Sequence, residues 1–125
     1  MVIIFYIGRV LFGGFFVYNA INHLKNRTAM AVFARSKHIP VPMASVIVTG
    51  MLMLLGGLSI MIGYRMVIGM WLLLAFLIPT TLLMHQFWKQ EVPEARMNEW
   101  LNFSKNIALI GALCIMLSLA YLYFS

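Results

Sequence analysis

Apolar residues fall into four long runs along the chain, and polar residues gather in the short stretches between them. The runs cover approximately residues 2–24, 43–63, 66–88 and 101–124. An α-helix rises 1.5 Å per residue, so about 20 residues cross the roughly 30 Å of hydrocarbon in a bilayer. A helix also satisfies its own backbone hydrogen bonds, which lipid cannot do. The pattern therefore predicts an all-α integral membrane protein, built as a four-helix bundle.

The stretch between the first two runs, residues 25–42, has a different character. Basic side chains surround a short apolar patch at residues 29–33, and Pro40 and Pro42 prevent a helix from continuing. Short helices of this kind lie in the membrane interface with the apolar side toward the acyl chains. We therefore expect an interfacial amphipathic segment between the first two membrane helices. All 125 residues are expected to form a single domain.

Composition agrees with a membrane environment, because 63% of the residues are hydrophobic and only 10% are charged. Soluble domains carry about 25% charged residues.

The three acidic residues, Glu91, Glu94 and Glu99, are expected to lie in one solvated loop, which gives no carboxylate site for a metal. The single cysteine, Cys114, is expected to pack inside a helix bundle, and it cannot form an internal disulfide. Nothing in the sequence indicates nucleic-acid binding.

Basic residues predict the orientation in the membrane. The first and third loops and the start of the last run contain most of them: Lys25, Arg27, Arg35, Lys37, Lys89, Arg96 and Lys105. The opposite side has only Arg65, with Arg9 inside the first run. The positive-inside rule then places loops one and three in the cytoplasm and both termini outside, in a bacterial inner membrane. Arg9 is either an anchor at a helix end or part of a buried polar cluster.

Several polar side chains occur near run ends that this topology places on the cytoplasmic side. They are Asn22, His23, His85, Trp88, Lys105 and Asn106. A four-helix bundle would bring these residues to one membrane depth, with Lys105 at the start of the last helix. Ionisable groups at the edge of hydrocarbon are costly unless they are paired or wetted, so they often mark functional sites. We therefore predict one polar cluster formed by these six residues.

The third run also contains Pro79, which removes a backbone hydrogen bond and predicts a kink. Thr80 and Thr81 are expected to satisfy the carbonyl that Pro79 leaves free. The helix is expected to continue to Trp88, so that Thr81, His85 and Trp88 lie on one face.

Several motifs together resemble the DoxX-like family of small membrane proteins. They are Gly8-Arg9, His38-Ile39-Pro40, Gly56-Gly57-Leu58 through Gly63, His85-Gln86-Phe87-Trp88 and the stretch from Phe103 to Gly111. The resemblance covers essentially the whole chain. It implies a four-helix membrane bundle and a link to quinone-coupled sulfur oxidation or to membrane-bound oxidoreductase complexes. The chain has Met53 where relatives often have an acidic residue, and His38 where they often have glycine.

The first functional hypothesis is an accessory subunit of a quinone-linked or other membrane oxidoreductase. In it, His85 exchanges a proton with a quinone, Lys105 or Asn106 holds a carbonyl oxygen, and Trp88 stacks on the ring. The structural alternative is that His85 and Lys105 only hydrogen-bond helix ends and lipid headgroups.

The second hypothesis is a non-catalytic scaffold or assembly factor. It would pack against larger membrane proteins, or against copies of itself, through Gly56 and Gly57.

A haem held between His23 and His85 has less support, because each histidine has an easier role at an interface. A transporter is disfavoured because the sequence shows no inverted repeat.

Overall fold

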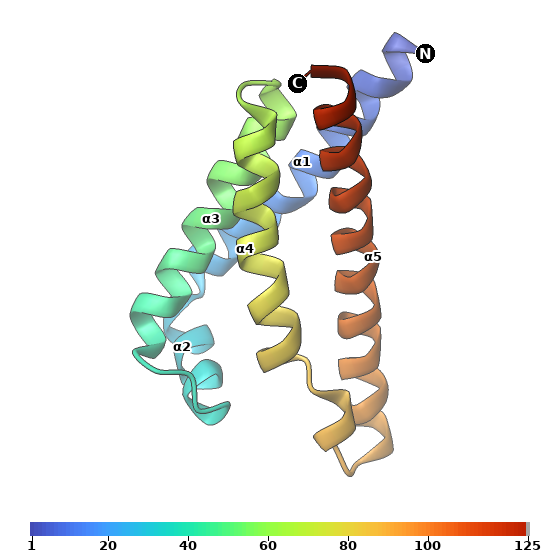
Figure 1. The fold of residues 1–125 in the computed structure, drawn as a ribbon. Helices are drawn as coiled ribbons and strands as arrows, with labels where there is room; N and C mark the ends of the chain where they lie inside the picture. Colours follow the sequence, from blue (N-terminus) through green and yellow to red (C-terminus); the bar gives the residue numbers. More distant parts are fainter. Residues whose placement is uncertain (125) are drawn as a thin grey trace. The chain divides into compact units, whose positions relative to one another are not determined.

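The computed structural model describes residues 1–124, and in that range the chain forms helices and no strand (Figure 1). The elements are α1 (Val2–Lys25), α2 (Arg27–Ser36), α3 (Pro42–Ile62), α4 (Met66–Met84), the 3-10 turn η1 (Phe87–Lys89) and α5 (Pro93–Phe124). Helices α1, α3 and α5, and α4 with the turn that follows it, are long and apolar enough to cross a membrane. The predicted all-α class is confirmed, and the chain is a multi-pass membrane protein with lipid as its environment.

The chain forms two compact units, Met1–Phe76 and Leu77–Ser125, and the division falls within α4. The prediction of a single domain stays a prediction.

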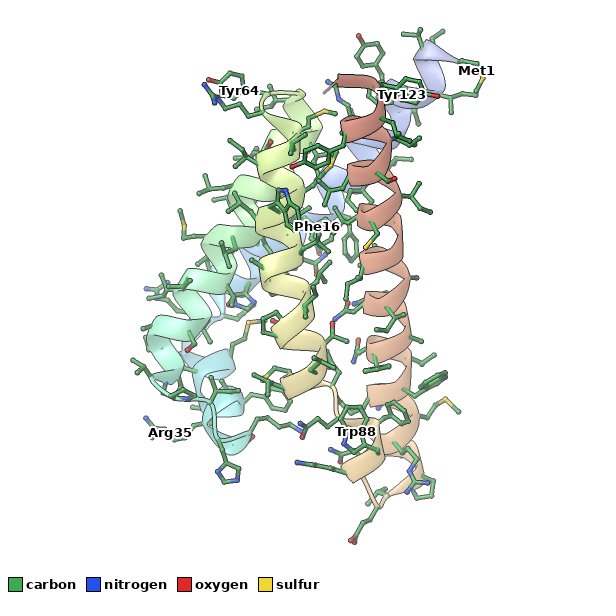
Figure 2. All side chains as sticks on the ribbon, in the orientation of Figure 1. Met1, Phe16, Arg35, Tyr64, Trp88 and Tyr123 are labelled. Atoms are coloured by element: carbon green, nitrogen blue, oxygen red, sulfur yellow. The ribbon has the colours of Figure 1, made fainter. Side chains whose placement is uncertain are left out.

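In the first unit, α1 and α3 pack closely where two glycines meet. A Cβ added at Gly13 would lie 2.6 Å from the carbonyl oxygen of Gly57, and a Cβ at Gly57 would lie 2.9 Å from that of Gly13. Gly13, Phe16 and Ala20 form the buried face of α1 at the i, i+3, i+7 spacing of a helix (Figure 2 labels Phe16). The two backbones can approach this closely only because neither glycine has a side chain.

The neighbouring glycine on α3 faces the first half of α4. A Cβ at Gly56 would lie 2.8 Å from the Leu73 side chain and 2.9 Å from the carbonyl oxygen of Gly69. Gly56 and Gly57 are both buried in contacts within this chain. The prediction that these two glycines contact a partner protein is therefore wrong. Adjacent positions on a helix point to different neighbours, so the pair serves two internal helix contacts.

Helix α2 confirms the predicted short helix after α1. Ala31 and Ala34 are buried, and α2 packs against α3. Val32 and Phe33 are exposed, at 67% and 45%, which leaves an apolar surface available to lipid.

The turn after α2 has an unusual backbone conformation at His38. His38 has φ of +62°, and its N–H donates to the carbonyl oxygen of Arg35 at 3.0 Å. Positive φ is uncommon for residues other than glycine. Glycine would therefore suit the backbone at this position better than histidine does.

The second unit corrects the predicted end of the third apolar run. The α-helix of α4 ends at Met84, and His85 and Gln86 separate it from η1. Thr81, His85 and Trp88 therefore do not form a continuous helical face, and that prediction is wrong. The helix ends at the last apolar residue before the polar pair His85 and Gln86.

Helix α5 begins earlier than the predicted residue 101. It starts at Pro93, with Glu94 in its first turn. Proline is favoured at the first helical position, and a carboxylate there interacts well with the helix dipole. Glu94 and Glu99 therefore belong to a helix, and the prediction that all three acidic residues share a solvated loop is wrong.

Helix α5 has 32 residues, so it is about 48 Å long and exceeds the roughly 30 Å of a hydrocarbon core. Lys105 lies about 18 Å from the start of α5, not at its beginning as predicted. The buried positions of α5 follow one stripe: Asn106, Leu113, Leu117 and Ala120. Cys114 lies off this stripe and is exposed, so the prediction that it packs internally is wrong.

Candidate functional site

His23, near the end of α1, is bound to α3 in the first unit. Its Nε2 lies 3.0 Å from Oγ1 of Thr49. The Thr49 hydroxyl has one proton, and carbonyl oxygens of Ser45 and Val46 lie 2.8 and 3.0 Å away to accept it. When that proton goes to a carbonyl oxygen, the hydroxyl oxygen accepts from His23 in the tautomer that carries its proton on Nε2.

Gly50 makes this arrangement possible. A Cβ at Gly50 would lie 2.6 Å from the Leu24 side chain and 3.1 Å from Cδ2 of His23. The imidazole also meets the Phe76 ring edge-on, with centroids 6.4 Å apart. Asn22 is half-buried beside it, and its carbonyl oxygen accepts the N–H of Asn26 at 3.0 Å. These contacts give His23 a structural role in holding α1 against α3.

The second unit contains an imidazole–carboxylate pair. Nδ1 of His85, in the segment after α4, lies 3.1 Å from Oε2 of Glu99 on α5. The two side chains are 21% and 17% exposed, so the pair is largely removed from solvent. A carboxylate accepting from Nδ1–H holds the ring in the tautomer that leaves Nε2 without a proton.

Four aromatic rings gather next to this pair. Phe87 lies at the centre, with ring centroids of Trp88, Trp100 and Phe103 at 5.2, 4.9 and 5.2 Å. Trp88 and Trp100 remain 49% and 45% exposed (Figure 2 labels Trp88). The cluster therefore fixes η1 on α5 and still leaves parts of two indole rings available for other contacts.

Two polar residues of the second unit are buried. Thr81 is 1% exposed, and its Oγ1 has no hydrogen-bond partner within residues 1–124. Asn106 is 6% exposed and lies seven residues after Glu99, so both are on one face of α5 about 10 Å apart along the axis. A buried hydroxyl without a partner is uncommon and calls for an explanation, such as a bound ligand or water. The prediction that Thr81 satisfies the carbonyl left free by Pro79 is wrong.

Comparison with family models identifies the chain's relatives. The DoxX family model matches residues 4–86, which is more than half of the chain. The chain belongs to the DoxX family. Comparisons with curated proteins and with solved structures found no match.

The DoxX match confirms the resemblance inferred from the motifs, and it covers α1 to α4 together with His85 and Gln86. Trp88, Glu99 and Asn106 lie after the matched range. The carboxylate half of the imidazole–carboxylate pair therefore comes from a part of this DoxX chain that the family model does not match.

The six predicted site residues divide between the two units. Asn22 and His23 lie in the first, and the other four lie in the second: His85, Trp88, Lys105 and Asn106. The prediction that all six form one cluster stays a prediction. Lys105 is exposed, and it interacts with other parts of the described chain.

Sequence reasoning did not identify the two residues that pair with the histidines, Thr49 and Glu99. Thr49 was indistinguishable from other small polar residues in an apolar run. Glu99 was assigned to a loop because charged residues seldom continue a membrane helix. The relevant pattern was Pro93 followed by acidic residues, which is typical of a helix start.

The two threonines lead to opposite predictions for stability. Thr81→Val removes a buried hydroxyl without a partner and keeps the shape of the side chain, so the free energy of unfolding should rise by about 1 kcal/mol. Thr49→Val removes the acceptor of His23 and should lower it by about 1 to 2 kcal/mol. Thermal unfolding of both variants in the same detergent measures the two changes. Destabilisation by Thr81→Val would mean that its hydroxyl is satisfied.

Proposed function

We propose that this DoxX protein is an accessory subunit of a membrane oxidoreductase and that its second unit holds a quinone headgroup. The observation that carries the proposal is the pair formed by His85 and Glu99, 3.1 Å apart and largely screened from solvent. In a chain with three acidic residues, one of them is placed against a histidine beside exposed indole rings. A purely structural membrane helix needs no such pair.

The pair is suited to moving a proton. Glu99 accepts from Nδ1–H of His85 and so leaves Nε2 to act. In the neutral ring Nε2 accepts a proton, and in the protonated ring it donates a hydrogen bond to a carbonyl oxygen. The same atom can therefore serve in both directions.

Other residues of the second unit offer groups that a flat ligand with two carbonyl oxygens could use. Thr81 has a buried hydroxyl with no partner in the described chain, and Asn106 offers a buried amide that can donate. The exposed part of Trp88 can stack on an aromatic ring. A quinone supplies the redox chemistry, because it takes up two electrons and two protons to form a quinol. Trp88 would position the ring, and His85 would hold or release one proton at Nε2.

The proposal assigns electron transfer to a partner protein, which is why the role is that of an accessory subunit. The scaffold alternative has lost its structural basis at Gly56 and Gly57, because both glycines are used inside the chain.

We further propose a bacterial inner membrane, with loops one and three in the cytoplasm. The distribution of basic residues supports this orientation. A C-terminal alkaline phosphatase fusion that is inactive would contradict it.

The proposal predicts that the wild-type protein retains a quinone when it is purified from native membranes in a mild detergent. His85→Ala should lower the quinone content per protein at least about ten-fold, since it removes both the proton acceptor and the hydrogen bond. Glu99→Gln should lower it less, because the amide can still hold the ring but carries no charge. Quinone is extracted and quantified by liquid chromatography with absorbance detection.

Two further variants make the test specific. Thr81→Val should lower quinone content without loss of stability, which separates ligand binding from folding. His38→Asn is the matched control, because it removes an exposed histidine from the first unit and asparagine tolerates the positive φ. Equal quinone content in wild type and His85→Ala would contradict the proposal. Recovery of partner proteins with no quinone in any sample would instead favour the scaffold.

A further inference from the structure

An apolar groove of about 250 Å³ lies beside the turn between α3 and α4, within the first unit. Its walls are aliphatic side chains from both helices: Leu55, Leu58, Ile62, Ile68 and Leu72. Tyr64 and Arg65, the two residues of the turn next to Gly63, line its end (Figure 2 labels Tyr64). The groove is open, so in the membrane it is accessible to lipid.

Ser59 and Gly69 line the groove where it meets the turn. The Ser59 Oγ lies 2.6 and 2.9 Å from the carbonyl oxygens of Tyr64 and Arg65, where its hydroxyl can donate to either. Gly69 allows this contact, because a Cβ there would lie 2.5 Å from Oγ of Ser59. Arg65 has φ of +51°, which is unfavourable for arginine and is maintained by these surroundings. The hydrogen bonds of Ser59 therefore hold the turn in one conformation, and that conformation sets the position of the Arg65 side chain.

Arg65 brings a positive charge to the end of this groove. Its Nε donates to the Tyr64 hydroxyl oxygen at 3.2 Å, which uses one of the five guanidinium N–H donors. The Tyr64 hydroxyl proton is then free to point to another acceptor. Residues 1–76 contain no aspartate or glutamate, so the first unit has no carboxylate of its own to neutralise Arg65. A guanidinium remains charged at any physiological pH and pairs well with phosphate oxygens.

We propose that this groove is a binding site for an anionic phospholipid. One acyl chain lies along the aliphatic walls, and the phosphate accepts hydrogen bonds from the Arg65 guanidinium and the Tyr64 hydroxyl. The charge of the ligand is complementary to the only charged residue that lines the groove. This site is independent of the proposed quinone function, because its residues lie in the first unit and those of the quinone site lie in the second.

Native mass spectrometry of the purified protein in a neutral detergent tests the proposal. The protein is titrated with phosphatidylglycerol and, separately, with phosphatidylcholine carrying the same acyl chains. We expect one tightly bound phosphatidylglycerol and a preference of about five-fold over phosphatidylcholine. Arg65→Gln should abolish the preference, and Arg65→Lys should keep part of it. Leu55→Trp fills the groove from an exposed position and should weaken binding of both lipids.

Two control variants separate the groove from general effects. Arg35→Gln removes the same charge from an exposed position on α2 and should keep the preference (Figure 2 labels Arg35). Leu101→Trp adds the same bulk at an exposed position on α5 and should leave lipid binding unchanged. An equal loss of preference in Arg35→Gln and Arg65→Gln would overturn the proposal. It would also be overturned if Leu55→Trp binds lipid normally or if a second copy of the chain occupies the groove.

Discussion

Replacing Gly13 with leucine is expected to prevent α1 and α3 from packing and to abolish the folded state of the first unit. A Cβ at this position would already lie 2.6 Å from the carbonyl oxygen of Gly57, 2.8 Å from the backbone nitrogen of Met61 and 2.9 Å from its Cβ. Backbone atoms cannot move aside as a flexible side chain can, so the two helices must separate. We expect the free energy of unfolding to fall by about 3 kcal/mol or more, and Gly13→Ala to cause a smaller loss in the same direction.

Gly8 offers a matched control on the same helix. A Cβ at Gly8 would meet nothing within 4 Å, and the residue is exposed. Gly8→Leu should therefore change stability by less than about 0.5 kcal/mol. The measurement is the fraction of monodisperse protein that survives heating, followed by fluorescence-detected size-exclusion chromatography. Similar survival of Gly13→Leu and Gly8→Leu would show that the contact between α1 and α3 is not needed for the fold.

The four membrane helices could be predicted because their length and apolarity are properties of each segment alone. Lipid accepts apolar side chains on all sides, so no tertiary information is needed to recognise a spanning helix. Helix ends were harder, because the end of an apolar run is not the end of a helix. Helix α4 stops at Met84 inside its run, and α5 starts at Pro93 before its run begins.

The contacts of the glycines could also be predicted only in part from the sequence. The sequence predicted that Gly56 and Gly57 pack closely against another helix, but it assigned that helix to a partner protein or to another copy of the chain. Which helix the glycines face depends on how α3 is rotated about its axis. Because a membrane helix is apolar on every face, the sequence does not determine that rotation. The structure shows contacts to Leu73 and to Gly13.

The candidate site was predictable in part for a similar reason. Polar residues in apolar runs are conspicuous, so His23 and His85 could be identified without a structure. Their partners could not, because Thr49 and Glu99 are 26 and 14 residues away and are defined by tertiary contacts. Each histidine was expected to meet the other polar residues near the run ends. The structure shows a local partner for each, Thr49 for His23 and Glu99 for His85, and the wider cluster stays a prediction.

Arg9 illustrates how a structure decides between two interpretations that the sequence left open. Its Nη2 donates to the carbonyl oxygens of Ile62 at 3.1 Å and Met61 at 3.4 Å, at the C-terminal end of α3. A positive charge is favourable there, because the last carbonyl groups of a helix are unsatisfied and carry partial negative charge. Gly63, with φ of +86°, leaves room for the guanidinium, since a Cβ there would lie 2.8 Å from Cζ of Arg9. Arg9 therefore caps α3 from a position on α1.

This role predicts that Arg9→Met lowers the free energy of unfolding by about 2 kcal/mol, which is the scale of a hydrogen bond to a charged group. The loss should not be larger, because Nε of Arg9 is buried with no partner in the described chain and its removal offsets part of the cost. The measurement is thermal unfolding in detergent at low and high salt. High salt should narrow the difference between wild type and variant, because it screens the interaction with the helix end.

Arg27→Met is the matched control for this prediction. Arg27 also donates to a helix-end carbonyl, that of Leu24 at 3.0 Å, but the two residues are neighbours in sequence and exposed to solvent. Its loss breaks no contact between distant helices, so stability should change by less than about 0.5 kcal/mol. If Arg9→Met and Arg27→Met have equal small effects, Arg9 is an anchor for lipid headgroups, and the end of α3 is stable without it. A loss confined to Arg9→Met would establish that α1 and α3 are joined by a cap at the end of α3 as well as by the contact between Gly13 and Gly57.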